Sequence, residues 1–129
     1  MIKKLLVSAV FCSSALLANE ALVKNMHDME SGMDYIQKGY LYNNIELVKN
    51  GIKEIQKANV ILKGMDTSSY LPENKKHMAN IALNSATKMD EALESMKSYI
   101  DKKEIVKSHD AYSNVLSSCV ICHSLVRNW

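Results

Sequence analysis

The sequence predicts an all-α protein that folds as a single antiparallel, up-down-up-down four-helix bundle. Two observations carry this prediction. The 129 residues include only four glycines and one proline, so the residues that interrupt helices are nearly absent. Beyond the first 18 residues, apolar side chains recur at every third or fourth position, which is the spacing of one buried helix face. Four helices joined by short loops pack as antiparallel neighbours.

Residues 1–18 have the pattern of a secretory signal peptide. A positively charged start precedes an apolar run over residues 5–17, and Ala18 is a small residue at a plausible cleavage point. The run is too short to span a bilayer as a mature helix, so we expect no stable membrane insertion after cleavage. The mature protein would be the four-helix domain of residues 19–129, exported to the periplasm. A retained N-terminal anchor is the alternative.

The charge balance argues against a nucleic-acid binder. The formal charge of +2 comes from 16 basic and 14 acidic residues, and two of the lysines belong to the predicted leader. The mature chain is therefore close to neutral and carries no basic stripe of the kind that binds a phosphate backbone.

The first two helices are predicted from two apolar seams. The first seam has spacings of four, three, four, three and four residues and comprises Leu22, Met26, Met29, Met33, Ile36 and Tyr40. Gly39 is placed to end this helix. The second seam comprises Ile45, Val48, Ile52, Ile55, Val60, Ile61 and Leu62. Gly51 lies within it and costs about 1 kcal/mol relative to alanine, so tertiary packing must compensate.

Residues 64–72 form the one clear loop, because they are rich in turn-forming residues. Pro72 then begins a third helix, whose inward residues are Met78, Ala82, Met89, Ala92, Leu93, Met96 and Ile100. The chain turns again near Asp101. The inward residues of the last helix are Ile105, Tyr112, Val115, Leu116, Cys119, Cys122 and Val126. Since the fourth helix runs antiparallel to the first, its C-terminal end should face residues 22–30.

The most specific motif is C-x-x-C-H at Cys119, Cys122 and His123, the attachment pattern of a c-type haem. Two thiols three positions apart lie on one helical face, where each can form a thioether with a haem vinyl group. His123 then offers an imidazole nitrogen to the iron. A thioredoxin-type use expects a βαβ context, and a zinc site needs further ligands at familiar spacing; the sequence has neither. The third cysteine, Cys12, leaves with the leader.

A four-helix chain with C-x-x-C-H at its extreme C-terminus resembles the class II c-type cytochromes, the cytochrome c′ family. The likeness covers the mature chain and is strongest over residues 102–127, where Arg127 takes the place of a basic residue four positions after the histidine. Val126 departs from the pattern, which commonly has an aromatic residue there. The resemblance implies one covalently attached haem c, with both motif cysteines bound to it, His123 as proximal iron ligand, and Arg127 near the proximal pocket or a propionate.

The same resemblance implies a function that depends on the sixth position of the iron. Low-spin members of the family place a methionine there and transfer electrons, whereas high-spin members leave the iron five-coordinate beneath an apolar side chain and bind small gases. Met26 is the first candidate for the distal ligand, with His27 and Met29 as alternatives, and Val23 would lie over a five-coordinate iron. We therefore expect a one-electron carrier between respiratory redox proteins and not an enzyme, or alternatively a protein that binds NO or CO.

Association is left open by the sequence. Family members are often dimers through the first two helices, and Tyr35, Tyr40 or Leu41 could contribute to such a contact, but a monomer is equally admissible. Tyr112 is expected to pack beneath the haem or between helices. Trp129 would cover the haem edge or fray at the terminus.

Overall fold

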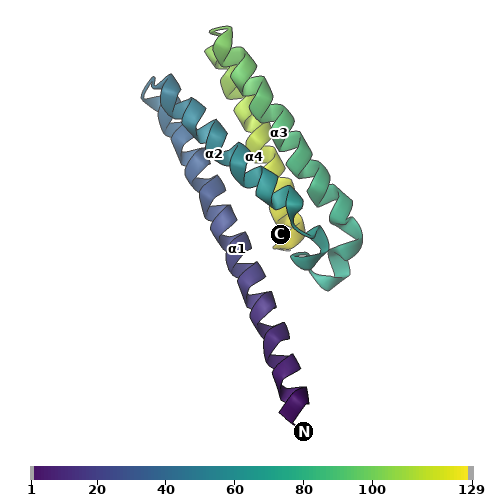
Figure 1. Ribbon diagram of the computed structural model, residues 1–129. Coiled ribbons are helices and arrows are strands. Elements are labelled where there is room, and N and C mark those ends of the chain that lie inside the picture. The colour runs from purple at the N-terminus through teal and green to yellow at the C-terminus, as the bar shows by residue number, and fades with distance from the viewer. Residues whose placement is uncertain (1, 128–129) are drawn as a thin grey trace.

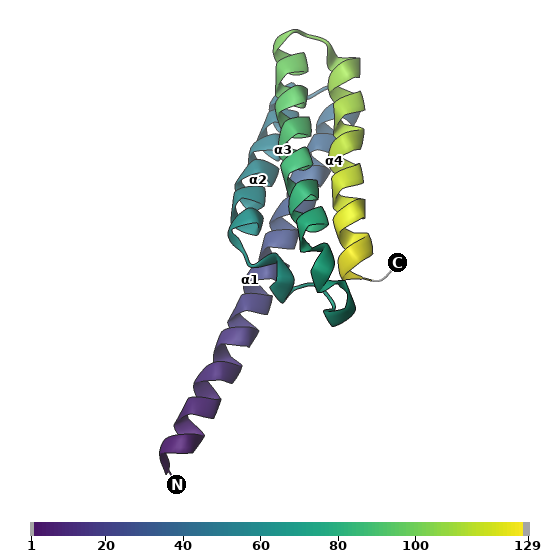
Figure 2. The ribbon, with the colours of Figure 1, turned by 90° about the vertical axis from the view of Figure 1, so that its right-hand side faces the viewer.

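The computed structural model describes the backbone of residues 2–127 and the side chains of residues 20–127. Its elements in chain order are α1 (Ile2–Leu41), α2 (Ile45–Gly64), the 3-10 turns η1 (Thr67–Ser69) and η2 (Glu73–Met78), α3 (Ala79–Asp101) and α4 (Ile105–Val126). No strand occurs between residues 2 and 127. The four α-helices alternate in direction and pack against one another, so the predicted all-α, up-down-up-down bundle is confirmed (Figures 1 and 2). The backbone of the predicted leader continues α1; its side chains, like Trp129, lie outside the described residues.

Helix α1 continues through Gly39, which was expected to end it, and stops two residues later at Leu41. The prediction was wrong because Gly39 serves packing and not termination. A Cβ atom at this position would lie 2.5 Å from Cγ2 of Val48 and 2.7 Å from the Val48 amide nitrogen. The turn itself is made by Asn43, whose φ of 53° is left-handed, and by Asn44, whose side chain accepts a hydrogen bond from the backbone N–H of Leu47 at 3.0 Å.

Two further glycines let α1 and α2 approach at backbone distance. A Cβ atom on Gly32 would lie 2.9 Å from the carbonyl oxygen of Gly51, and one on Gly51 would meet the Gly32 carbonyl oxygen and lie 2.9 Å from the Ile36 amide nitrogen. The close crossing supplies the tertiary packing that was expected to offset the poor helix propensity of Gly51.

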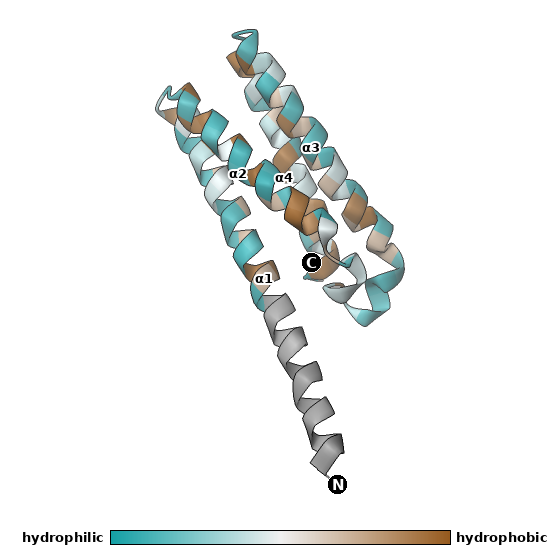
Figure 3. Ribbon diagram, in the orientation of Figure 1, coloured by the Kyte–Doolittle hydropathy of each residue, from teal (hydrophilic) through white to brown (hydrophobic). Residues whose placement is uncertain are grey.

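All but three of the predicted inward positions are buried or half-buried. Ile36, Ile52, Leu93, Met96 and Val115 are at most 1% exposed. By contrast, Val60, Ile61 and Leu116 are 65%, 47% and 48% exposed, so their prediction as inward residues was wrong. Val60 and Ile61 belong to an unbroken apolar run at the C-terminal end of α2 (Figure 3). A helix can turn only part of such a run toward the core, because successive residues are rotated by about 100°.

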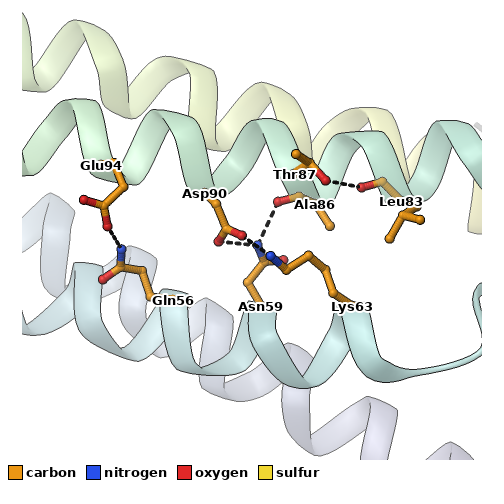
Figure 4. A network of polar contacts seen from close by, with 8 residues as sticks. All are labelled: Gln56, Asn59, Lys63, Leu83, Ala86, Thr87, Asp90 and Glu94. Atoms are coloured by element: carbon orange, nitrogen blue, oxygen red, sulfur yellow. Dashed lines mark hydrogen bonds and ion pairs between the residues drawn. The ribbon is translucent and has the colours of Figure 1, made fainter.

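The interface between α2 and α3 is fixed by polar side chains as well as by apolar ones (Figure 4). Asn59 is fully buried, and its Nδ2 atom donates to the carbonyl oxygen of Ala86 at 2.8 Å and to Oδ1 of Asp90 at 2.7 Å. The other carboxylate oxygen of Asp90 pairs with the ammonium of Lys63. Because a buried amide is costly unless it is hydrogen-bonded, these contacts set the rotation of α2 against α3.

The chain between α2 and α3 wraps around one end of the bundle. Pro72 precedes η2 and not an α-helix, and α3 begins only at Ala79, so the predicted start of the third helix was wrong. The reason lies in Leu71, which is 5% exposed and packs with Ala82 and Leu125. Holding Leu71 there bends the following residues into tight 3-10 turns before the α-helix becomes regular.

Candidate haem-attachment site

The two cysteines of the C-x-x-C-H motif lie on the last two turns of α4 as free thiols at the edge of the core. Both are half-buried, but they contact different apolar clusters. Cys119 packs against the main core of the bundle, whereas Cys122 packs against the smaller cluster of Leu71, Ala82 and Leu125. Their spacing of three residues puts the sulfurs on neighbouring positions of one helix face, as attachment to one planar group requires.

Burial keeps the reactive groups of the motif uncharged at neutral pH. Burial, assisted by neighbouring Cys122, raises the pKa of the Cys119 thiol to about 11, and burial also raises the pKa of Cys122. For His123 burial acts in the opposite direction and lowers the pKa, and the positive charge of Arg127 lowers it further. The imidazole is therefore in the neutral form that can bind iron.

The helix face that carries His123 also carries two exposed apolar side chains. Leu116 and Val120 precede His123 by seven and three residues, so all three share one side of α4. Leu116 is 48% exposed and Val120 is 46% exposed. Exposed apolar side chains beside a pair of thiols and a neutral imidazole are chemically suited to a flat, apolar, covalently held group. The surroundings of the motif therefore fit a haem.

The register between α1 and α4 is set at the opposite end of the bundle by Tyr40. Its hydroxyl lies 2.6 Å from Oγ of Ser108, and its ring centroid lies 6.3 Å from that of Tyr112. Tyr40 is therefore an interhelical residue, as its place in the first apolar seam predicted. Ser108 in turn donates to the carbonyl oxygen of Met96 at 3.2 Å, so Ser108 links Tyr40 to α3.

By this register Met26 is the predicted distal residue that lies level with His123 along the bundle. Antiparallel helices advance by the same rise per residue in opposite directions. Met26 lies four turns before Tyr40, so it is level with the last turns of α4, where His123 is found. Met33 lies only two turns before Tyr40 and is level with the region just before Cys119. Both methionines are half-buried, on the same side of α1 as Tyr40.

Asn25 fixes the rotation of α1 at this level. It is 3% exposed, and its Nδ2 atom donates to the carbonyl oxygen of Ala58 on α2 at 3.0 Å. With Asn25 directed at α2, the next residue, Met26, is rotated by about 100° around the helix axis. Tyr40, which contacts α4, lies on the same side of α1 as Met26, and Met26 packs against the main core.

The alternative distal residues lie in less suitable surroundings. The His27 side chain is 72% exposed, and its Nδ1 atom lies 3.4 Å from the carboxylate of Glu30. Met29 is 7% exposed and belongs to the main core. Val23 is 49% exposed. Of the three candidates, only Met26 is half-buried, whereas His27 is exposed and Met29 is buried.

Two basic residues form hydrogen bonds with carbonyl groups in the last turn of α4. Arg127, which the sequence singled out, donates its backbone N–H to the carbonyl oxygen of His123 at 2.8 Å and is exposed. Lys75, which the sequence did not single out, donates from Nζ to the carbonyl oxygen of Ser124 at 2.9 Å. Lys75 and Ser124 are 49 residues apart, and no spacing or pattern in the sequence signals their contact.

Within the part of the chain that the structure describes, no group of three or more His, Cys, Asp and Glu side chains could hold a metal ion by itself. A haem iron does not need such a group, because the porphyrin supplies four nitrogen ligands and the protein only the axial ones.

No helix among the described residues is both long enough and apolar enough to cross a membrane.

Comparisons with protein-family models, with curated proteins and with solved structures found no match for this chain.

Proposed function

We propose that this chain is an exported, periplasmic mono-haem cytochrome of the class II type, which carries one electron at a time between respiratory redox proteins. The observation that carries the proposal is the C-x-x-C-H motif at Cys119, Cys122 and His123, on an exposed apolar face at the end of a helical bundle. Both thiols are free and protonated, and the imidazole is neutral. Free thiols are available for thioether bonds, and a neutral imidazole can bind iron.

The residues of the chain have separate tasks in this function. Each cysteine adds its S–H group across a vinyl double bond, a step that needs no oxidant. A bound haem supplies an iron that cycles between the ferrous and ferric states. His123 would bind the iron of that haem, and Met26 is the first candidate for its second protein ligand. Leu116 and Val120 exclude water from one face, and the rigid bundle keeps the two axial side chains in place.

A second candidate function is supported by the packing of Met26. Its side chain is half-buried against the main core. If it stays in the core, the iron would be five-coordinate beneath Val23 and open to a small gas such as NO or CO. The ligand set of the iron therefore decides between an electron carrier and a gas-binding protein.

The absorption spectrum of the purified ferric protein separates these functions. A low-spin spectrum with a thioether-to-iron charge-transfer band is expected for the electron carrier. Met26→Ala should remove this band and produce a high-spin spectrum, whereas Met33→Ala, a matched change two turns away on the same side of α1, should retain it. An unchanged spectrum in Met26→Ala would show that another residue is the ligand. A high-spin, five-coordinate wild type would favour gas binding.

A further inference from the structure

The connection between α2 and α3, residues 65–78, lies against the end of α4 that carries the haem motif (Figures 1 and 2). Leu71 is buried with Ala82 and Leu125, and Cys122 packs on this cluster. Tyr70 contacts both this cluster and the main core, and it lies close enough to Cys122 for the two to interact electrostatically. The connection therefore covers one of the two attachment thiols.

The connection is itself an ordered structure. Oδ1 of Asp66 accepts hydrogen bonds from the backbone N–H of Ser68 at 3.0 Å and from its hydroxyl at 2.8 Å, which caps η1. The backbone N–H of Lys75 donates to the carbonyl oxygen of Pro72 at 2.8 Å, which fixes the first turn of η2. The backbone of Lys75 is thus held in place before its side chain reaches across to α4.

The side chain of Lys75 binds the last turn of α4. Its Nζ atom donates to the carbonyl oxygen of Ser124, the residue directly after His123, at 2.9 Å in a partly buried position. Carbonyl groups in the last turn of a helix have no donor within the helix, and a cation there is favoured by the helix dipole. The neighbouring Lys76 is directed elsewhere and pairs with the exposed carboxylate of Glu73 at 2.7 Å.

We propose that Lys75 is a positioning residue for the proximal histidine: it anchors the turn of α4 that holds His123 and places a positive charge beside it. This inference rests on the proposed haem function. A positive charge near the proximal ligand destabilises ferric iron more than ferrous iron, because the ferric state carries one more positive charge. Lys75 therefore raises the midpoint potential and restrains local opening at the end of α4.

The test compares Lys75→Met with Lys76→Met in the haem-loaded protein. Both changes remove one positive charge from adjacent positions, but only the first breaks the contact with α4. Lys75→Met should lower the midpoint potential more than Lys76→Met does. It should also speed amide hydrogen exchange in the last turn of α4 by about tenfold, as expected for loss of one charged hydrogen bond. Lys76→Met should leave this exchange at the wild-type rate, and Lys75→Arg should restore it.

The results have distinct meanings. Equal potentials and equal exchange rates in the two methionine variants would overturn the role of Lys75. A change in exchange without a larger change in potential would overturn the electrostatic part of the proposal. Purification of a protein without haem would instead overturn the proposed function, and the exchange measurement would still decide whether Lys75 anchors α4.

Discussion

The close crossing of α1 and α2 makes Gly51→Ala a sharp test of the packing that aligns the site. Alanine has a higher helix propensity than glycine, so in an isolated helix this change would stabilise by about 1 kcal/mol. In the folded protein the new methyl group would meet the carbonyl oxygen of Gly32 and lie 2.7 Å from Cγ1 of Ile36. One of these neighbours is backbone, so relief requires α1 and α2 to separate.

The net change in the free energy of unfolding is the cost of overpacking minus the gain in helix propensity. Overpacking a well-filled interface costs about 1–3 kcal/mol and more when backbone must move, so we take the upper part of this range. Subtracting the gain in propensity leaves a net destabilisation of roughly 2 kcal/mol. For a domain of this size that lowers the melting temperature by about 8–12 °C.

Gly64→Ala is the matched control. A Cβ atom at Gly64 has no neighbour within 4 Å, and the residue has no positive φ. This change should be neutral or stabilise by up to about 1 kcal/mol. Both variants are to be melted and unfolded in urea with helicity followed by circular dichroism. A Gly51→Ala protein as stable as Gly64→Ala would show that the helices do not meet at backbone distance.

Two other predictions follow from the site and from Tyr40. The Cys119→Ala/Cys122→Ala double variant should carry no covalent haem and be less helical and less stable, because it loses a group that completes the core; equal ellipticity and an equal unfolding midpoint would contradict this. Burial raises the pKa of Tyr40 although its hydrogen bond with Ser108 opposes the shift, so the native state binds this proton more tightly than the unfolded state does. Its contribution to the free energy of unfolding is thus complete below pH 10 and decreases as the pH rises further. Tyr40→Phe should be less stable by about 1 kcal/mol at pH 8 and lose stability less steeply above pH 10, and parallel urea-midpoint profiles would refute the assignment.

The helices could be predicted from the sequence because their burial is periodic. The first seam, from Leu22 to Tyr40, repeats at helical spacing, and the turn near Asp101 separates the seams of the third and fourth helices. The errors arose where one residue type serves two purposes. Glycine is typical of helix ends, but Gly39 lies where α1 contacts α2, and the contact leaves no room for a side chain. Pro72 can begin an α-helix, but here it follows the buried Leu71 and is followed by the 3-10 turn η2.

The candidate site could be predicted only in part. The C-x-x-C-H motif is local, so its spacing alone indicates its chemistry. Asn25 and Lys75 act through hydrogen bonds to backbone carbonyls on other helices, and such partners leave no pattern in a single sequence. The distal ligand depends on the register of α1 against α4. That register is set by the contact of Tyr40 with Ser108, which becomes visible only in the folded chain.

The central claim is that a haem is bonded covalently to the two sulfurs near the end of α4. Intact-mass spectrometry under denaturing conditions, on protein matured in its native compartment, tests it most directly. The account predicts the mass of the polypeptide from residue 19 onward plus one haem. The mass of the polypeptide alone would contradict it.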